Sequence, residues 1–233
     1  MAVYEFAGTV VEIRNRYPYL EKQCRGFLSS GEPSIIIEVT QEEIRQELDK
    51  VGKNFSPGYA ESICAYRKLC LQMPKFGGIF LHASVIRVEN RGIAFLAPSG
   101  TGKTTHTGLW QKLLGDKLTV INGDKPIVKL TSNGPIAYGT PWAGKEGLYE
   151  KDSVTLTDLC FIERSEENSC TPLPPEQTLS KILHQVIMPG QAQTALQTLD
   201  LLDQLLRRCN LWLIRCNIHP DAAKCAYETI FHK

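Results

Sequence analysis

The glycine-rich turn at residues 97–104, Ala-Pro-Ser-Gly-Thr-Gly-Lys-Thr, is the stretch of this sequence best suited to chemistry. It matches the G-x-x-x-x-G-K-[ST] pattern at its last three residues and departs from it at the first glycine, where this chain has Ala97. Gly100 and Gly102 allow a tight curl whose backbone N–H groups converge. A helix that begins directly after the turn adds its own unpaired N–H groups and the positive end of its dipole. The turn therefore predicts a binding site for nucleotide phosphates.

The side chains of this turn have separate expected roles. Lys103 adds a full positive charge for the β- and γ-phosphates, Thr104 offers a hydroxyl to a magnesium ion, and Thr105 contacts a neighbouring phosphate. The residues expected to bind the nucleotide are Pro98, Ser99, Gly100, Thr101, Gly102, Lys103, Thr104 and Thr105. A turn without a ligand is the alternative, but an apolar run before the turn and a helical pattern after it favour the phosphate site. We expect ATP, ahead of GTP, together with Mg²⁺.

A carboxylate follows the next predicted strand. Asp124 comes 21 residues after Lys103, which is enough for a helix, a turn and a strand that returns beside the first one. Asp124 would then lie at the same carboxyl edge of the sheet as the glycine-rich turn. At that edge it can bind magnesium or accept a proton from an attacking hydroxyl. The alternative is that Gly-Asp-Lys-Pro at 123–126 is ordinary turn composition.

A third segment, residues 139–147, has the sequence Gly-Thr-Pro-Trp-Ala-Gly-Lys-Glu-Gly. Three glycines, a tryptophan and a lysine in nine residues are unusual for a simple connection. One interpretation is a substrate or lid loop in which Lys145 closes over the phosphates and Trp142 forms a wall of the site. The other is a surface turn that Trp142 anchors by packing. The sequence leaves both open. His106, by contrast, is expected to pack or to face water.

The apolar pattern predicts an α/β fold, with a mixed β-sheet that contains the phosphate-binding turn and is flanked by helices. The predicted strands are 3–13, 34–39, 118–121, 156–162 and 211–215, with hairpins that pair 79–88 with 93–97 and 127–130 with 136–138. The predicted helices are 41–51, 57–71, 103–114, 179–187, 191–208 and one from about 219, and residues 165–175 are expected to be an exposed connection. We expect residues 1–75 to pack on the same domain as a kinase-like core at 76–233.

Composition excludes several classes of protein. The 233 residues include 26 Lys plus Arg and 25 Asp plus Glu, so the chain lacks the strong positive field of a nucleic-acid-binding protein. No apolar run approaches the roughly 18 residues that span a bilayer. We therefore expect a cytoplasmic protein without nucleic-acid or membrane partners. The eight cysteines form no C-x-x-C pair, and we expect them to be small buried apolar residues.

The order of these features resembles a known family. A hairpin before the glycine-rich turn, His82 near its start, the turn itself and an Asp after the next strand are similar to the catalytic domain of HPr kinase/phosphorylase and its smaller relatives. More distantly they resemble the nucleotide-binding part of ATP-dependent phosphoenolpyruvate carboxykinase. The specific motifs cover residues 79–130. The resemblance implies ATP and Mg²⁺ on residues 100–105, Asp124 as base toward a serine hydroxyl, and His82 near the γ-phosphate.

These features together predict an ATP- and Mg²⁺-dependent kinase that transfers the γ-phosphoryl group to a hydroxyl, with Asp124, Lys103 and His82 as catalytic residues. The acceptor stays open between a serine of a peptide or protein and a small alcohol. An ATP-binding accessory or regulatory protein with little turnover is the alternative. It is favoured by Gly123-Asp124, because the family commonly has two adjacent acidic residues here. Family members are often oligomers, so a homo-oligomer is also open.

Overall fold

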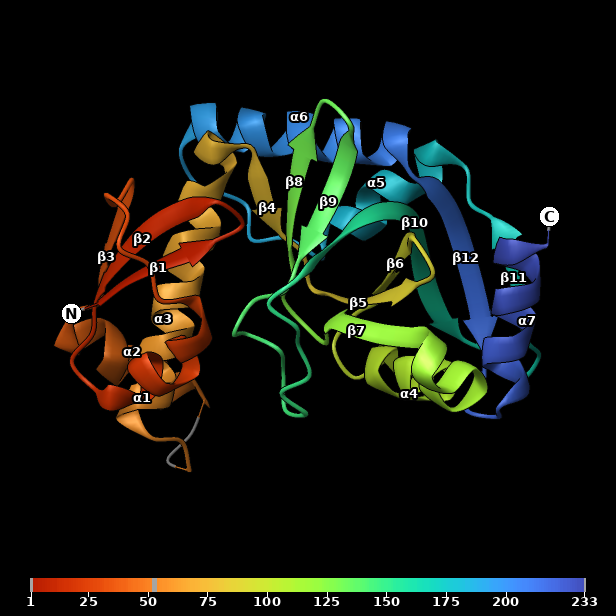
Figure 1. Ribbon diagram of the computed structural model, residues 1–233, viewed down its shortest axis with the longest axis horizontal. Coiled ribbons are helices and arrows are strands. Elements are labelled where there is room, and N and C mark those ends of the chain that lie inside the picture. The colour runs from red at the N-terminus through yellow and green to blue at the C-terminus, as the bar shows by residue number, and fades with distance from the viewer. Residues whose placement is uncertain (1, 52–53, 233) are drawn as a thin grey trace.

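An N-terminal lobe lies beside a larger α/β body in the computed structural model, which describes residues 2–51 and 54–232 (Figure 1). The lobe packs helices against a small sheet with strand order β1-β2-β3. Its elements are β1 (Ala2–Phe6), β2 (Thr9–Arg14), α1 (Pro18–Gln23), the 3₁₀ turn η1 (Arg25–Phe27), β3 (Ile35–Glu38), α2 (Gln41–Val51) and α3 (Pro57–Gln72).

Local capping explains where the helices of the lobe begin. Before α2, Glu43 N donates to Thr40 Oγ1 at 3.2 Å and Thr40 N donates to Glu43 Oε2 at 2.8 Å, which is a capping box. Before α3, Ser56 Oγ accepts from Tyr59 N at 3.2 Å. The helices predicted at 41–51 and 57–71 are thus confirmed.

The single strand predicted at 3–13 is wrong, because two antiparallel strands occupy this segment. Ala7 and Gly8 turn the chain between them, with φ values of +50° and +70°. Only Gly adopts this conformation freely, so Gly8 lets the chain reverse within two residues. The hairpin aligns the buried side chains Tyr4 and Val11 on one face of the lobe's sheet.

The body is a curled mixed sheet with helices on both faces, as the sequence predicted. The strand order is β4-β8-β9-β10-β6-β5-β7, with β12 paired to β10 and β11 paired to β12. Its elements are η2 (Met73–Phe76), β4 (Gly78–Phe80), β5 (Ala83–Val88), β6 (Arg91–Leu96), α4 (Lys103–Leu114), η3 (Gly115–Lys117), β7 (Leu118–Asn122), β8 (Ile127–Thr131), β9 (Gly134–Tyr138), β10 (Ser153–Arg164), β11 (Ser169–Pro172), α5 (Pro175–Leu183), α6 (Ala192–Arg208), β12 (Asn210–Cys216) and α7 (Asp221–Phe231).

The two faces of this sheet bury separate apolar clusters. On one face, α5 and α6 cover strands β5, β6 and β10 through side chains such as Ile182 and Leu202. On the other face, α4 and α7 pack through Trp110 and Ala223. Burying a large apolar side chain stabilises the fold by roughly 1.5–3 kcal/mol. The sheet is therefore a rigid support for the residues at its edge.

Three other expectations from the sequence need correction. The segment 79–88 is not one strand, because β4 pairs with β8 and β5 pairs with β6, and the chain crosses between them at Leu81-His82. The connection 165–175 is not wholly exposed, because β11 pairs with the edge of β12 and buries Cys170. The helix predicted at 179–187 starts earlier, at Pro175, because proline is favoured in the first helical turn. It also ends earlier, at Leu183.

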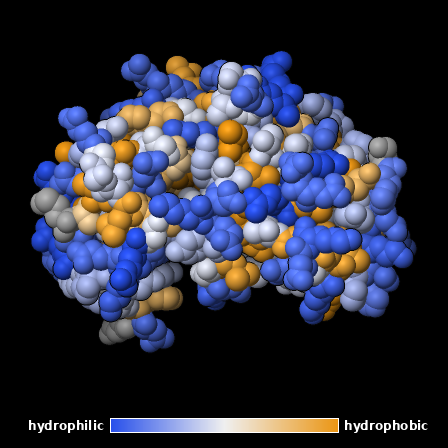
Figure 2. Space-filling view, in the orientation of Figure 1, coloured by the Kyte–Doolittle hydropathy of each residue, from blue (hydrophilic) through white to orange (hydrophobic). Residues whose placement is uncertain are grey.

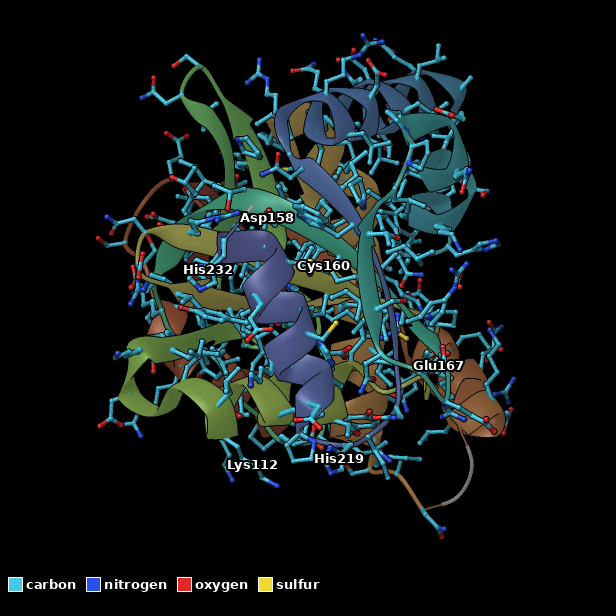
Figure 3. The ribbon with its side chains drawn as sticks, turned by 90° about the vertical axis from the view of Figure 1, so that its right-hand side faces the viewer. Lys112, Asp158, Cys160, Glu167, His219 and His232 are labelled. Atoms are coloured by element: carbon cyan, nitrogen blue, oxygen red, sulfur yellow. The ribbon has the colours of Figure 1, made fainter. Side chains whose placement is uncertain are left out.

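The end of the sheet remote from the glycine-rich turn is held by a buried ion pair. Asp158 on β10 has no exposed surface and receives two hydrogen bonds from Arg91 Nη2, at 2.8 and 3.0 Å. Arg91 Nη1 also donates to Ile230 O of α7 at 3.0 Å. Figure 3 shows Asp158 near the end of α7 opposite to His219. These contacts tie the last helix to the sheet.

The cysteines are placed as the sequence predicts. All eight cysteines are free thiols, and most are buried. Over residues 2–51 and 54–232, no helix is both long and apolar enough to cross a bilayer.

Candidate active site

Three strands bring the predicted catalytic residues to one edge of the sheet. β5 is antiparallel to both β6 and β7, so β6 and β7 end at the edge where β5 begins. The glycine-rich turn follows β6, Asp124 follows β7, and His82 precedes β5. The edge is the one predicted from the sequence, but the expectation that β7 lies directly beside β6 is wrong. β5 already pairs with the side of β6 that does not face β10, so β7 pairs with the free side of β5.

The glycine-rich turn has the backbone conformation that its sequence predicts. Gly100 and Gly102 have φ values of +77° and +127°, which other residues adopt only with strain, and α4 begins at Lys103. Ala97 is buried at the end of β6 and does not have a positive φ, so a methyl group at this position causes no strain. The turn is closed by a hydrogen bond from Thr101 N to Pro98 O at 3.2 Å.

Arg164, at the end of β10, holds the turn from a distant part of the chain. Its Nε donates to Thr101 O at 3.1 Å, and its Nη2 donates to Gly100 O. Both contacts engage carbonyl oxygens, so Arg164 holds the turn without occupying any of its N–H groups.

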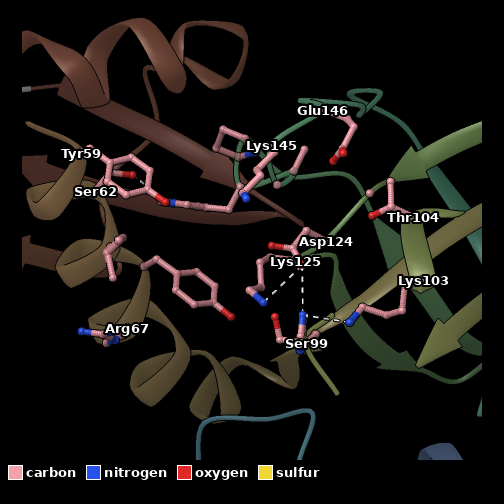
Figure 4. Close-up of a pocket in the computed structure, with 18 of the residues that line it drawn as sticks. Tyr59, Ser62, Arg67, Ser99, Lys103, Thr104, Asp124, Lys125, Lys145 and Glu146 are labelled. Atoms are coloured by element: carbon pink, nitrogen blue, oxygen red, sulfur yellow. Dashed lines mark hydrogen bonds and ion pairs between the residues drawn. The ribbon is translucent and has the colours of Figure 1, made fainter. Parts of the chain in front are cut away.

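A row of polar side chains runs from the turn into the interior of the site (Figure 4). Lys103 Nζ donates to Ala97 O at 2.8 Å and lies 3.0 Å from His82 Nε2. The same His82 nitrogen lies 3.2 Å from Asp124 Oδ1, which in turn is 3.4 Å from Lys125 Nζ. The order is therefore Lys103, His82, Asp124, Lys125, with one carboxylate between two ammonium groups.

Burial and charge shift the pKa values along this row. Burial lowers the pKa of Lys103 to about 8, against the attraction of Asp124. Burial alone would raise the pKa of Asp124, but the hydrogen bond from His82 and the charge of Lys125 hold it below its ordinary value. Burial also lowers the pKa of Lys125. Asp124 is thus a carboxylate at neutral pH and is suited to bind a cation or to accept a proton.

The turn that carries Asp124 is fixed by the fully buried Asn122. Its Oδ1 accepts from Asp124 N at 2.9 Å and from Lys125 N at 2.7 Å, and its Nδ2 donates to Thr140 O at 3.0 Å. Gly123 lies tightly against the next segment, since a Cβ there would be 3.1 Å from Ala143 O. A second acidic side chain at position 123 would therefore force that segment to move.

A cleft of about 1340 Å³ lies between the N-terminal lobe and this edge of the sheet. In the space-filling view the outline is notched between the lobe and the body, and hydrophilic residues predominate around the notch (Figure 2). Tyr59, Ser62 and Arg67 of α3 stand on one wall, and Lys103 and Thr104 stand on the opposite one (Figure 4). Single-ligand pockets measure roughly 300–1,000 Å³, so this cleft has room for a nucleotide and a second molecule.

The two candidate residues of the 139–147 segment lie in different surroundings. Trp142 is only 7% exposed and packs against Phe6 and Phe80, while its Nε1 donates to Ser62 Oγ at 3.1 Å. This packing joins the lobe to the body, and Trp142 also lines the cleft, so the structure shows features of both interpretations. Lys145 is exposed and lines the cleft near Asp124 (Figure 4).

Several residues that shape the site were missed in the sequence. Lys125, Asn122, Thr140 and Arg164 all contact the row or its turns. For Asn122 the signal was present, because Asn before Gly-Asp often folds a turn by accepting backbone hydrogen bonds. For Arg164 no local signal exists, since 63 residues separate it from Thr101.

The expected magnesium ligands fit the chemistry of that ion in part. Within the described ranges, no group of three or more His, Cys, Asp or Glu side chains is arranged to hold a metal by itself. Magnesium bound with nucleotides commonly uses one or two carboxylates and takes its other ligands from phosphates and water. The exposed Thr104 hydroxyl and the Asp124 carboxylate are suitable donors for such a shared site.

Comparisons with known proteins find a likeness to solved structures. No protein-family model and no curated protein matches this chain. Among solved structures the chain is similar to the Hpr(Ser) kinase/phosphatase from Coxiella burnetii, with a TM-score of 0.31 and 13% sequence identity. That alignment covers 55% of this chain and 88% of the other.

Proposed function

We propose that this protein is an ATP-dependent phosphotransferase that moves the γ-phosphoryl group to a hydroxyl of an acceptor in the cleft. The observation that carries the proposal is the row that leads from the glycine-rich turn through Lys103 and His82 to Asp124. A cradle of N–H groups, a lysine and a carboxylate at one sheet edge are the parts that phosphoryl transfer requires.

The turn would hold the triphosphate, and Lys103 would move toward the β- and γ-phosphates. In the structure Lys103 donates to Ala97 O, so nucleotide binding would exchange this neutral acceptor for charged phosphate oxygens. The carbonyl oxygen of Ala97 is neutral, whereas phosphate oxygens are charged, so the exchange adds the attraction between opposite charges. His82 would then lose its contact with Lys103 and keep Asp124 as its partner.

Asp124 would orient the acceptor hydroxyl and accept its proton at one carboxylate oxygen. The acceptor oxygen would bond to the γ-phosphorus as the bond from that phosphorus to ADP breaks, and ADP would leave with the electron pair. Its Oδ1 is already bound by His82, which leaves Oδ2 for the hydroxyl or for a metal. Thr104 and Asp124 would hold magnesium when it is bound, and the ion would supply charge neutralisation on the phosphates. The α3 wall of the cleft, which includes Tyr59, would cover the acceptor and exclude water from the transferred group.

An ATP-binding regulatory protein with little turnover is the second candidate. The observation that favours it is Gly123, which leaves the turn with Asp124 as its one carboxylate and packs closely against Ala143 O. A single acid would then bind metal and leave no base for the acceptor.

Nucleotide binding and transfer are tested together with a matched pair of variants. Lys103→Ala should weaken binding of Mg·ATP by at least about 100-fold in calorimetry, because a buried charge-assisted contact is lost. Lys112→Ala, at an exposed lysine in the last turn of the same helix, is the control. Label from γ-³²P-ATP that appears on a hydroxyl acceptor supports the kinase. Label that reaches only water favours the regulator, and equal ATP affinity of the two variants would contradict both.

A further inference from the structure

We infer that the acceptor carries an anionic group, a carboxylate or a phosphate, beside the hydroxyl that is phosphorylated, and that Lys125 binds this group. The inference rests on the proposed function and names the chemical class of its second substrate. It follows from the position of Lys125, from its neighbours and from the charge that it carries.

Lys125 occupies the acceptor end of the polar row. Lys103 lies at the glycine-rich turn, and Lys125 lies beyond Asp124 on the side of α3 (Figure 4). His82 and Asp124 stand between the two lysines. A triphosphate on the turn would therefore be met by Lys103, whereas a molecule on the α3 side would meet Lys125.

The charge of Lys125 is poorly balanced by the protein. Its side chain is 22% exposed, and the ion pair found for it within residues 2–51 and 54–232 is with Asp124, at 3.4 Å. That distance is long for a charge-assisted hydrogen bond, and the same carboxylate oxygen is shared with His82. The nearby Cys70 adds no negative charge, because burial raises the pKa of its thiol to about 12.

Catalysis by Asp124 would remove part of this balance. When Asp124 binds magnesium or takes up the proton of the acceptor, its negative charge is no longer available to Lys125. Leaving a largely buried ammonium group without a counter-charge is costly. A carboxylate or phosphate on the acceptor would restore the balance and would fix the hydroxyl next to Asp124.

The other cation on this wall is already engaged. Arg67 Nη2 donates to Glu47 Oε1 at 3.0 Å, and Arg67 Nη1 contacts Glu47 Oε2. Glu47 is 2% exposed, so this pair is part of the packing between α2 and α3. Lys145 also lines the cleft, but its side chain is exposed, so Lys125 is the partly buried cation that contacts Asp124 and is best placed to bind the acceptor.

Three acceptors with the same three-carbon skeleton test the inference. D-glycerate offers a carboxylate, glycerol 3-phosphate a phosphate, and glycerol no charge. We expect kcat/KM for at least one anion to exceed that for glycerol by about 10- to 100-fold, and Lys125→Gln to remove that preference. The readout is kcat/KM for the anion divided by kcat/KM for glycerol, because a general loss of activity lowers both values and cancels from their ratio. Lys125→Arg should keep the preference, and Lys75→Gln, at an exposed lysine of η2, should leave it unchanged.

A binding measurement separates this inference from the proposed function. Saturation-transfer NMR with glycerate and glycerol, in the presence of magnesium and a non-hydrolysable ATP analogue, requires no turnover. If no variant transfers phosphate but glycerate binds and Lys125→Gln abolishes that binding, the proposed function fails and the anion site stands. Equal use or equal binding of glycerol and both anions overturns the inference, and so does a preference that survives Lys125→Gln.

Discussion

His82 Nε2 lies between two charged groups, 3.0 Å from Lys103 Nζ and 3.2 Å from Asp124 Oδ1. A neutral imidazole nitrogen either accepts a hydrogen bond from the lysine or donates one to the carboxylate, but it does not do both. The two contacts of Nε2 therefore compete, and a ligand that draws Lys103 away favours the tautomer in which Nε2 donates to Asp124. His82 therefore links the occupancy of the glycine-rich turn to the state of the carboxylate.

Replacing His82 should separate nucleotide binding from transfer. In His82→Ala, Lys103 keeps Ala97 O as a partner, so we expect the Kd for Mg·ATP to change by less than about threefold. Asp124 loses the hydrogen bond that orients it, and we expect kcat to fall by at least about tenfold. Calorimetry and initial rates give the two values. His219→Ala, at an exposed histidine remote from the row, is the control, and a joint loss of binding and rate would contradict the assignment.

Asp124→Asn tests the proposed base directly. The amide keeps the size of the side chain but cannot accept a proton, so phosphoryl transfer should fall by roughly two or more orders of magnitude. The Kd for the nucleotide without metal should remain within a few-fold of the original value. An unaltered transfer rate would remove Asp124 from this role.

The parts of the site that the sequence predicted are those set by nearby residues. The glycine-rich turn and the helix after it depend on backbone freedom at Gly100 and Gly102, and these effects act within a few residues. The capping box before α2 and the hairpin β5–β6 are local in the same sense. A pattern of residue types can therefore indicate them without knowledge of the rest of the chain.

The parts that the sequence did not predict depend on contacts between distant segments. That β7 joins β5 instead of β6 is decided by which strand edge is free once the hairpin has formed. Trp142 packs against Phe6, which is 136 positions earlier in the chain, and neither residue indicates the other. The split of segment 79–88 follows from the pairing of β4 with β8.

Arg164 should position the glycine-rich turn without touching the nucleotide. Arg164→Gln loses the two hydrogen bonds to Gly100 O and Thr101 O, so the turn can relax away from the conformation that binds phosphate. We expect the Kd for Mg·ATP to rise by about tenfold, with kcat at saturation changed less. Arg164→Lys should recover part of the affinity. Unchanged affinity in Arg164→Gln would show that the turn holds its shape alone.

The ion pair at the remote end of the sheet should govern stability. Asp158→Ala leaves the partly buried Arg91 without its carboxylate and removes an acceptor from Trp212 Nε1, which lies 2.9 Å from Asp158 Oδ1. Removing one partner of a fully buried pair costs roughly 3–5 kcal/mol, and because the Arg91 side chain is 29% exposed we expect a loss below that range. Urea unfolding followed by circular dichroism measures the loss, and a change below about 1 kcal/mol would contradict the assigned role. Nucleotide affinity of the folded protein should be unaltered.

His106 should make the protein less stable in acid. Burial lowers the pKa of His106 from 6.5 to about 4, and its Nε2 accepts a hydrogen bond from Trp110 Nε1 at 3.0 Å. The folded protein therefore favours the neutral form of the His106 ring. Protonation would place two donors against each other. Because the folded pKa lies below the unfolded one, this contribution is complete above pH 6.5 and is lost as the pH falls toward 4. It amounts to roughly 3 kcal/mol. Urea unfolding from pH 7 to pH 4.5 should show a steeper loss of stability than in His106→Gln, whose amide oxygen can still accept from Trp110. Equal slopes in the two proteins would exclude His106 as the group responsible.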